Sequence, residues 1–490
     1  MTTLQSLLSP LTFLGGLIED QNQLAPLKEY ESWWREEGMT ISEAVDRAGT
    51  PWLRMFDQFG QRVDEILFPP EYWKMLKRGY QAGVIWRPFA KDSRASLRMH
   101  YLIDYVTCFF DAGLGCPYIV SMSTAVPLKK YGTPELQERF LPHLLRRDES
   151  VWQGATWMTE IKGGSDLGAN VETTARNAGD RWILNGDKYF ASNVGAELAI
   201  VAARPEGAPK TPQGLALFLV PRYRDDGATL NYFIRRLKNK IGTRSVPTGE
   251  VELRDSEAYL IGRPEWGIYL ILESLNLSRV GNIVGSVALA QRALADALTF
   301  AAGRVAFGKP IIQHPLLRRQ FNERFAQLQD ARALMWEAIQ LLDEVWPESP
   351  RYSDRYHLFR LVAHLAKYWT AELAVQFAKW GMEVHGGMGV LAEYSAERWL
   401  REAMILPIWE GTPHRQMLDG LEVMERKRAH QLLFDHLARH ADQSELQHIS
   451  SRIEQHLQLA AEEKEAGIEP IFHDLATFTA QALARKYGGS

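Results

Sequence analysis

The spacing of hydrophobic residues changes twice along this chain of 490 residues, and each change limits the folds that it can adopt. Over residues 1–150, apolar side chains recur three or four positions apart, as in Tyr105 and Phe109, which is the spacing of a helix face. Residues 151–265 hold short β-forming runs instead, and helical spacing then returns. The sequence therefore predicts an α+β protein in which a middle β domain separates two helical domains.

Capping residues predict where several helices begin. Thr133 precedes a proline, the favoured arrangement of a cap followed by the first helical position, and Ser353 precedes another segment with helical spacing. We expect an N-terminal helical domain over 1–150 and a C-terminal bundle of long helices over 266–430. Residues 431–490 are predicted to form a charged helical appendage.

The middle domain, 151–265, is predicted as an antiparallel β domain. Asn185-Gly186 lies between apolar β-forming residues, a pattern that favours a hairpin turn. Strands are expected over Leu198–Ala202, Leu215–Val220 and Glu250–Leu253, and a turn near Asp255 after the last of them.

The composition excludes several classes of protein. A formal net charge of −4 gives no overall bias toward nucleic acid. The two cysteines, Cys108 and Cys116, match no metal site and no disulfide framework, so we expect reduced thiols and no bound metal. The apolar run Leu7–Ile18 is broken by proline and glycine, which predicts neither a signal peptide nor a membrane span and favours a cytoplasmic location.

Four phrases of the sequence contain residues suited to binding and chemistry. Met-Thr-Glu-Ile-Lys-Gly-Gly-Ser-Asp at 158–166 carries a glycine pair that lets backbone approach a flat or phosphorylated ligand. Arg-Val-Ala-Phe-Gly-Lys-Pro begins at Arg304, whose guanidinium suits a pyrophosphate. Glu-Val-His-Gly-Gly begins at Glu383, and Trp-Glu-Gly-Thr begins at Trp409.

Together and in this order, these phrases resemble the acyl-CoA dehydrogenase superfamily of flavoproteins. The resemblance covers roughly residues 90–430 and is strongest to the AidB branch, which is linked to the response to DNA alkylation. It implies FAD as the cofactor, an acyl-CoA thioester as the substrate and an electron-transfer flavoprotein as an acceptor. It also implies a homotetramer, because the family's cofactor motifs act across a subunit boundary.

The resemblance assigns roles to residues of this sequence. Glu410 would be the catalytic base, which takes the α-proton of the thioester while a hydride leaves the β-carbon for flavin N5. The implied cofactor-binding residues are Met158, Thr159, Ser165, Phe190, Ser192, Arg304, Phe307, Glu383, Gly386, Gly387, Thr412 and His414. The implied substrate-binding residues are Ser165, Arg279, Trp409 and Gly411.

The surroundings of Glu410 in the sequence fit that role. Trp409 can exclude water, and Gly411 frees the loop before a helix start at Thr412-Pro413. A dry pocket would raise the pKa of the carboxylate toward neutrality, which the removal of a weakly acidic proton requires. The backbone N–H of Glu410 could then donate to the developing enolate oxygen.

The sequence departs from the family pattern at three places. Phe190 and Ser192 stand where the family has Trp-x-Thr, so a smaller ring would stack on the flavin. Glu383 and His414 stand where many members have Gln. A carboxylate at 383 would repel a diphosphate, which leaves ribose hydroxyls as an alternative partner for Glu383.

Two alternative functions stay open. One is an AidB-like flavoprotein that associates with nucleic acid in the alkylation response and has weak or no dehydrogenase activity. Five cations between Arg235 and Arg244 could attract CoA phosphates or nucleic acid, but 425–490 holds eight Lys/Arg against ten Asp/Glu, which disfavours duplex binding. The other is a flavin oxidase or monooxygenase on the same fold, in which the base would be Asp or missing.

Overall fold

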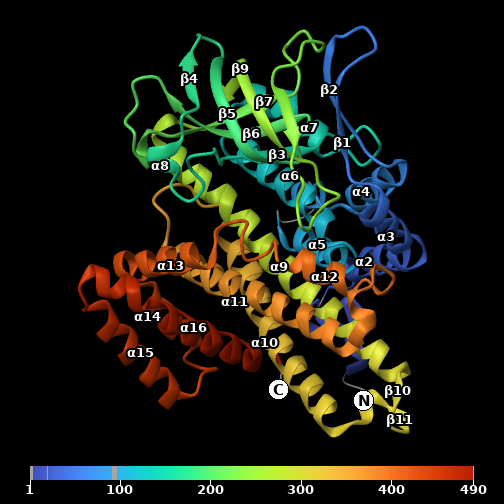
Figure 1. Ribbon diagram of the computed structural model, residues 1–490. Coiled ribbons are helices and arrows are strands. Elements are labelled where there is room, and N and C mark those ends of the chain that lie inside the picture. The colour runs from blue at the N-terminus through green and yellow to red at the C-terminus, as the bar shows by residue number, and fades with distance from the viewer. Residues whose placement is uncertain (1–3, 19, 91–95, 489–490) are drawn as a thin grey trace. The chain divides into compact units, whose positions relative to one another are not determined.

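A computed structural model describes residues 4–18, 20–90 and 96–488 (Figure 1). Its contacts divide the chain into two compact units, which we describe separately. The sheet unit combines Trp33–Ile103 with Asp111–Ser278, and the bundle unit combines Met1–Ser32, Asp104–Phe110 and Arg279–Ser490. The described residues before Trp33 therefore group with the C-terminal helices. The boundaries between the units fall within or at the ends of three helices: α2 (Gln21–Trp33), α5 (Arg98–Phe110) and α9 (Gly267–Gly303).

Within the described part of the sheet unit, seven strands form the main sheet in the order β3-β6-β4-β5-β9-β7, and β8 pairs with β9. Because β7 pairs with both β9 and β6, five of these strands close into a ring. Buried side chains such as Trp157, Phe218 and Tyr232 fill its core. The strands are β3 (Gly154–Trp157), β4 (Thr174–Asn177), β5 (Trp182–Ser192), β6 (Leu198–Pro205), β7 (Ala216–Pro221), β8 (Phe233–Leu237) and β9 (Thr248–Leu260).

The hairpin predicted at Asn185-Gly186 is wrong, because β5 runs straight through these residues and pairs with β9. The ladder is irregular at Gly186, whose φ is +150°, and a Cβ there would lie 2.6 Å from the Thr173 Cα. The glycine thus serves a close approach at a bulge and not a turn. The turn lies earlier, between β4 and β5, where the Ala178 N–H donates to the Arg181 carbonyl.

Two other details of the β domain differ from expectation. The turn predicted near Asp255 is wrong, since β9 continues through this residue, which adopts a φ of +47°. The sheet is mainly antiparallel, but β6 pairs in parallel with β3 and β4. The predicted strands Leu198–Ala202 and Glu250–Leu253 lie within β6 and β9, and Leu215–Val220 lies within β7 except for Leu215, which precedes it.

The rest of the sheet unit is mostly helical. Thr133 caps α7 as predicted, with its hydroxyl accepting from the Leu136 N–H. The hairpin of β1 (Trp52–Phe56) and β2 (Arg62–Leu67) was not predicted, because apolar and polar residues do not alternate along β1. Two of its apolar side chains are also largely exposed, Trp52 by 59% and Phe56 by 52%. The helices are α3 (Met39–Ala48), α4 (Pro70–Ala82), α6 (Ala112–Tyr131), α7 (Pro134–Leu144) and α8 (Leu167–Asn170).

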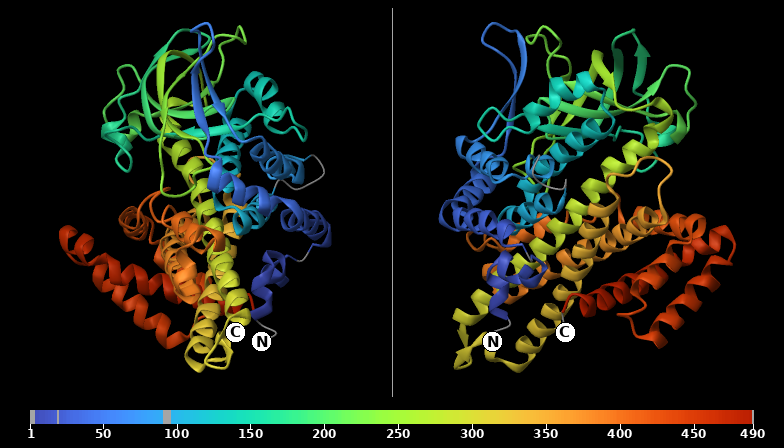
Figure 2. Two further views of the ribbon diagram at one scale, coloured as in Figure 1. Left: turned by 45° about the vertical axis from the view of Figure 1, so that its right-hand side comes forward. Right: turned by 180° about the vertical axis from the view of Figure 1, so that it is seen from behind.

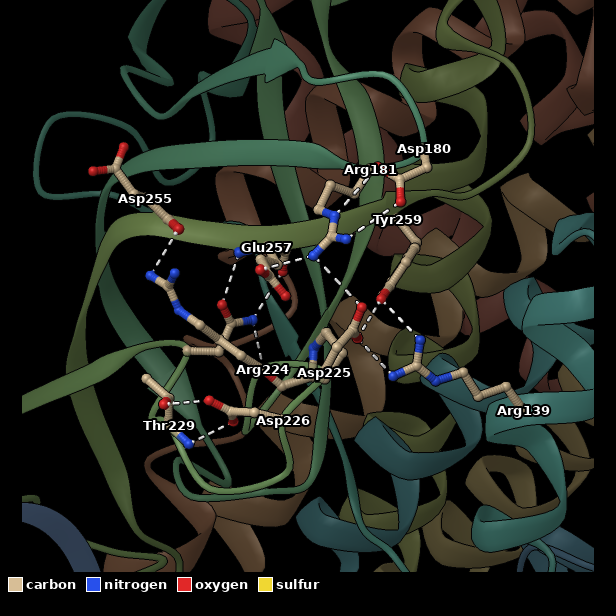
Figure 3. A network of polar contacts seen from close by, with 12 residues as sticks. Arg139, Asp180, Arg181, Arg224, Asp225, Asp226, Thr229, Asp255, Glu257 and Tyr259 are labelled. Carbon is tan, nitrogen blue, oxygen red and sulfur yellow. Dashed lines mark hydrogen bonds and ion pairs between the residues drawn. The ribbon is translucent and has the colours of Figure 1, made fainter.

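A polar network joins α7 to the sheet (Figure 3). Arg139 of α7 donates to Asp225 (2.7 Å) and to the Tyr259 hydroxyl of β9 (2.9 Å), and Tyr259 donates to the same carboxylate. Arg181 continues the network to Glu257 at 2.9 Å. Because Arg139 and Asp225 are exposed, the network orients α7 more than it stabilises the fold.

In the bundle unit, α11 packs against α10, α12, α13, α14 and α16 and is the central helix. Ser353 caps it as predicted, accepting from the Tyr356 N–H. A short hairpin, β10 (Val305–Ala306) and β11 (Lys309–Pro310), follows α9. The helices that begin and end in this unit are α1 (Pro10–Leu14), α10 (Pro315–Val345), α11 (Asp354–His385), α12 (Ala396–Ala403), α13 (Pro413–Lys427), α14 (Ala429–Leu437), α15 (Gln443–Leu457) and α16 (Ala461–Lys486).

The segment Pro264–Gly303, which contains α9, is the one helical stretch of the described residues that is long and apolar enough to cross a membrane. Of its most apolar 18-residue window, 78% is buried inside the protein, which is typical of a core helix.

Glu337 of α10 anchors the C-terminal appendage, shown in red in Figure 2. Its buried carboxylate accepts from His436 Nε2 (2.7 Å), Lys486 Nζ (2.6 Å) and the Tyr487 hydroxyl (2.6 Å). Burial raises the pKa of Glu337, but these three donors outweigh it and lower the pKa to about 2. The appendage is thus held by a buried, ionised carboxylate.

We expect this anchor to make stability depend on pH. A carboxylate whose pKa is depressed on folding stabilises the protein above its ordinary pKa of 4.5 and loses that contribution as pH falls toward 2. Glu337→Gln should lower the melting temperature at pH 7, with a loss of about 3 kcal/mol at most. Thermal unfolding followed by circular dichroism should show the two proteins converging between pH 4.5 and 2. Parallel curves over that range would contradict the prediction.

Candidate functional site

Glu410 lies in the loop between α12 and α13 with a left-handed backbone, φ +58°, and is followed by Gly411 at φ +100°. This conformation is uncommon for a residue with a side chain and costs on the order of 1 kcal/mol or more. The surrounding structure must therefore hold the loop in place. Two side chains from neighbouring helices do so.

Lys367 of α11 and Gln416 of α13 are both buried and donate to the loop's carbonyls. Lys367 Nζ donates to the Pro407 carbonyl (2.9 Å) and the Gly411 carbonyl (2.6 Å). Gln416 Nε2 donates to the carbonyls of Glu410 (2.9 Å) and Gly411 (3.0 Å). These hydrogen bonds tie the backbone of the loop to two helices. The side chain of Glu410 takes part in none of them.

His364, one turn before Lys367, orients Gln416. Its Nδ1 lies 2.9 Å from Gln416 Oε1, and because the amide nitrogen of Gln416 already donates, this oxygen must accept from the His364 Nδ1–H. Burial and the charge of Arg279 lower the pKa of His364 to about 3, so the ring is neutral at pH 7.

The electrostatic environment of Glu410 suits proton transfer near neutral pH. Burial raises the pKa of its carboxyl group to about 7, against the opposing charges of Arg279 and Lys367. Burial and the charge of Arg279 lower the pKa of Lys367 to about 7, against the opposing charge of Glu410. Arg279, on α9, is buried as well, and burial lowers its pKa while Asp419 and Glu410 oppose the shift. A carboxyl group of this kind can act as a general base.

The other residues predicted around Glu410 lie in the same loop or at the start of α13. Trp409 is partly buried, and within the described residues its indole Nε1 makes no hydrogen bond. Thr412 stands at the N-cap of α13 as predicted, although its side chain makes no capping bond within the described chain. His414 is exposed on the first turn. The backbone N–H of Glu410 likewise donates to no described residue.

The sheet unit brings together the first predicted group. Met158 is buried and Thr159 partly buried at the end of β3, and the Thr159 carbonyl accepts from the Tyr189 N–H of β5 at 3.0 Å. Ser165 is exposed at the end of the same loop. Phe190 and Ser192, two positions apart on β5, share a strand face, and Phe190 is 52% exposed. An exposed aromatic ring beside an ordered loop suits stacking against a flat ligand.

A buried ion pair between Lys188 and Glu160 holds the backbone of this loop in place. Lys188 Nζ, inaccessible to solvent, donates to Glu160 Oε1 (2.6 Å) and the Ala202 carbonyl (2.7 Å), and it lies 3.5 Å from the Met158 carbonyl. Glu160 also accepts from the Glu172 N–H at 2.7 Å and the Thr173 hydroxyl at 2.5 Å. These bonds fix the backbone beside Met158 and Thr159.

The remaining predicted residues lie elsewhere in the bundle unit. Arg304 is exposed after α9, and Phe307, in the β10–β11 turn, is 95% exposed. Arg304 follows Arg279 by 25 positions, which is roughly 37 Å along a helix. Within one bundle unit, this length of helix separates Arg304 and Phe307 from Arg279 and the loop of Glu410.

Gly386 and Gly387 follow α11 and are exposed. A Cβ added at either position would meet nothing within 4 Å, so the described chain leaves open space there. The φ of +61° at Gly386 favours glycine at that position for its backbone freedom. Glu383 forms an ion pair with Lys379 on the same helix, so the charge of its carboxylate is already balanced by a cation. His385 is buried and bonds to the Gly381 carbonyl at 2.7 Å, a packing role.

Three of the five cations between Arg235 and Arg244 form ion pairs with described residues. Arg235 pairs with Asp187 at 2.8 Å, and Arg236 and Lys238 pair with Glu250 at 2.7 and 2.8 Å. Among the described residues, no group of three or more His, Cys, Asp or Glu side chains could hold a metal ion.

Sequence reasoning missed Lys367, Gln416 and His364. They come from α11 and α13 and meet only because these helices pack together. One signal was present: His364 and Lys367 are polar residues, three positions apart, within a helix whose neighbouring residues are apolar.

Family profiles match most of the chain. Residues 265–424 match the acyl-CoA dehydrogenase C-terminal domain, 155–256 the acyl-CoA dehydrogenase middle domain, and 17–149 the adaptive response protein AidB N-terminal domain. Acyl-CoA dehydrogenase family member 11 of Caenorhabditis elegans is 31% identical over 80% of this chain and 66% of its own length. Putative acyl-CoA dehydrogenase AidB of Escherichia coli is 30% identical over 77% of this chain and 70% of its own.

Solved structures share the fold over nearly the whole chain. The apo form of Bd2924 has a TM-score of 0.88 and 28% identity, covering 100% of this chain and 97% of that one. Caenorhabditis elegans ACDH-11 in complex with C11-CoA has a TM-score of 0.81 and 26% identity, covering 95% of this chain and 86% of that one. The fold, with N-terminal helical, middle β and C-terminal helical regions, is that of acyl-CoA dehydrogenases.

Gly411→Ala should destabilise the loop by about 1–3 kcal/mol. Alanine is strained at φ +100°, and its Cβ would lie 2.6 Å from Gln416 Nε2, which would displace the amide that holds Glu410. Thermal unfolding should show a lower melting temperature for this variant. Gly303→Ala is the control, because a Cβ there meets nothing within 4 Å. Equal melting temperatures for the two variants would contradict the prediction.

Proposed function

Because the chain belongs to the acyl-CoA dehydrogenase family and its N-terminal part matches the AidB N-terminal domain, we propose that it oxidises an acyl-CoA thioester with FAD, using Glu410 as the base. One observation carries the proposal: burial raises the pKa of the Glu410 carboxyl group to about 7 in a loop held by two buried donors. An ordinary surface glutamate has neither property.

The described residues fit FAD, the cofactor that this family uses. Phe190 offers an exposed aromatic face beside the ordered backbone of Met158 and Thr159. Arg304 is an exposed cation suited to a diphosphate, and the open space at Gly386 and Gly387 admits a ligand close to the backbone. When bound, FAD supplies the acceptor for the hydride that leaves the β-carbon.

Glu410 performs the proton abstraction in this proposal. The α-proton of a thioester is weakly acidic, so a carboxylate with a pKa near 7 takes it up more readily than one near 4.5. The charges of Arg279 and Lys367 limit the rise of this pKa, which keeps a useful fraction of Glu410 ionised at neutral pH. The Glu410 N–H, which donates to no described residue, is available to the enolate oxygen.

The partners follow from the same family. C11-CoA is bound by ACDH-11 in its solved complex, and we extend this to a fatty acyl-CoA substrate here. We also expect an electron-transfer flavoprotein as acceptor, a cytoplasmic location and a homotetramer. The roughly 37 Å along α9 between Arg279 and Arg304 supports shared cofactor sites, because copies of the chain can then supply these residues to one another.

The alternative functions have less support. Three of the five cations of the 235–244 cluster are engaged in ion pairs within the described chain, which weakens its attraction for phosphates and weighs against an AidB-like association with nucleic acid. A glutamate with a raised pKa at position 410 weighs against a flavin oxidase or monooxygenase, in which the base is Asp or missing.

Glu410→Gln should reduce the rate of flavin reduction by acyl-CoA about 10²–10⁴-fold, because glutamine cannot accept the α-proton. Acyl-CoA should still bind and perturb the flavin spectrum. Anaerobic stopped-flow absorbance with a panel of acyl-CoAs measures both. Glu393→Gln, at an exposed glutamate between α11 and α12, is the control and should reduce the flavin normally. Unchanged reduction in Glu410→Gln would end the assignment.

The rate of flavin reduction should rise with pH and reach half its maximum near pH 7. The base must be ionised to accept a proton, and the pKa of Glu410 is raised to about 7. Single-turnover reduction from pH 5.5 to 9 checks this. A midpoint near pH 4.5, that of an unperturbed glutamate, would show that burial does not tune the base.

A further inference from the structure

We propose that Lys367 is a positioning residue for the reaction: it holds the 407–411 loop through its backbone and sets the charge state of Glu410. This inference rests on the proposed function for the role of Glu410. It goes beyond that function because it assigns a task to a side chain that touches neither substrate nor cofactor in the proposal.

The geometry shows how Lys367 acts on the loop. Its Nζ donates to two carbonyls four positions apart, those of Pro407 and Gly411, and so closes the segment that contains Glu410. Gln416 holds the next part of the loop by an uncharged amide. The loop therefore has one charged anchor and one neutral anchor, and their effects can be separated by substitution.

A buried lysine is a costly way to make two hydrogen bonds. Lys367 is 1% exposed, and an ammonium group loses its hydration on burial, which an amide or hydroxyl would lose at a smaller cost. The partial negative charges of two carbonyls and the carboxylate of Glu410 compensate for this loss. The charge of Lys367 in turn favours ionised Glu410, so the protonation of each group depends on the other.

Two other titratable groups of this cluster, His364 and Asp419, keep one protonation state near neutral pH. Burial and the charge of Arg279 keep His364 neutral. Burial raises the pKa of Asp419, but the charges of Arg415 and Arg279 outweigh it and lower that pKa. Glu410 and Lys367 are the members whose pKa values lie at about 7. The charged groups that act on the pair are Arg279 from α9 and Glu372 from α11. Around Arg279 lie Arg360 and His364 from α11 and Asp419 from α13, and Asp419 in turn pairs with Arg415 of α13.

The test compares Lys367→Met and Lys367→Gln with Gln416→Leu. Removing a positive charge near a carboxylate makes its ionisation less favourable, so both Lys367 variants should raise the pKa of Glu410 by about 1 unit or more. Gln416→Leu removes a loop anchor but no charge, and should leave that pKa unchanged while lowering the rate of flavin reduction. Lys367→Gln keeps one amide donor, so it should retain more activity at high pH than Lys367→Met.

Two readouts are needed. The first is infrared difference spectroscopy of protein labelled with ¹³C-glutamate, in which the Glu410 band is identified by its loss in Glu410→Gln. The second is the pH profile of flavin reduction. The infrared titration needs no turnover, so it tests the link between Lys367 and Glu410 even if Glu410→Gln were to reduce the flavin normally and the proposed function failed.

Lys464→Gln is the control for loss of a lysine in the bundle unit, because Lys464 pairs with Glu425 away from this cluster. It should shift neither titration. An unchanged Glu410 titration in folded, flavin-containing Lys367→Gln and Lys367→Met would overturn the proposal. Failure of both Lys367 variants to fold, with Lys464→Gln intact, would also overturn it, since Lys367 would then be needed for the fold itself.

Discussion

The loss of hydration that charged groups suffer inside the bundle unit governs the chemistry available at Glu410. Burial raises the pKa of this carboxyl group and lowers the pKa of the neighbouring lysine, and each charge limits the shift of the other. The backbone bonds from Lys367 and Gln416 make the arrangement possible, since a left-handed glutamate would otherwise relax to a common conformation. The packing of α11 against α13 supplies both donors, so the site depends on the bundle as a whole.

The same physical device occurs in the sheet unit. Lys188 is a second buried lysine that donates to a backbone carbonyl, that of Ala202, and to Glu160 beneath the loop of Met158 and Thr159. In each unit, a buried ammonium group fixes backbone next to residues predicted to meet a ligand. The two cases differ in charge balance: Glu160 keeps a lowered pKa because Lys188 and other donors outweigh its burial, whereas Glu410 has a raised one. Glu160 is therefore structural, and Glu410 is suited to exchange a proton.

Local patterns predicted the features that depend on neighbouring residues. The caps at Thr133 and Ser353 follow from side-chain hydrogen bonds a few positions away, and the helical and β regions follow from hydrophobic spacing. The Asn185-Gly186 prediction failed because the glycine accommodates Thr173, which is distant enough in sequence to be invisible to a turn pattern. The sequence motifs located Glu410, but its pKa depends on groups from α9 and α11 that only the packed bundle brings together.

The closure of β6, β4, β5, β9 and β7 into a ring bears on how the protein behaves at high concentration. A sheet that ends in long unpaired strands offers its free N–H and C=O groups to other chains, and this promotes aggregation. Here the strands that pair on one side only, β3 and β8, span Gly154–Trp157 and Phe233–Leu237, which is short for such recruitment. The main sheet, as far as the structure describes it, therefore offers only short free edges for edge-to-edge association.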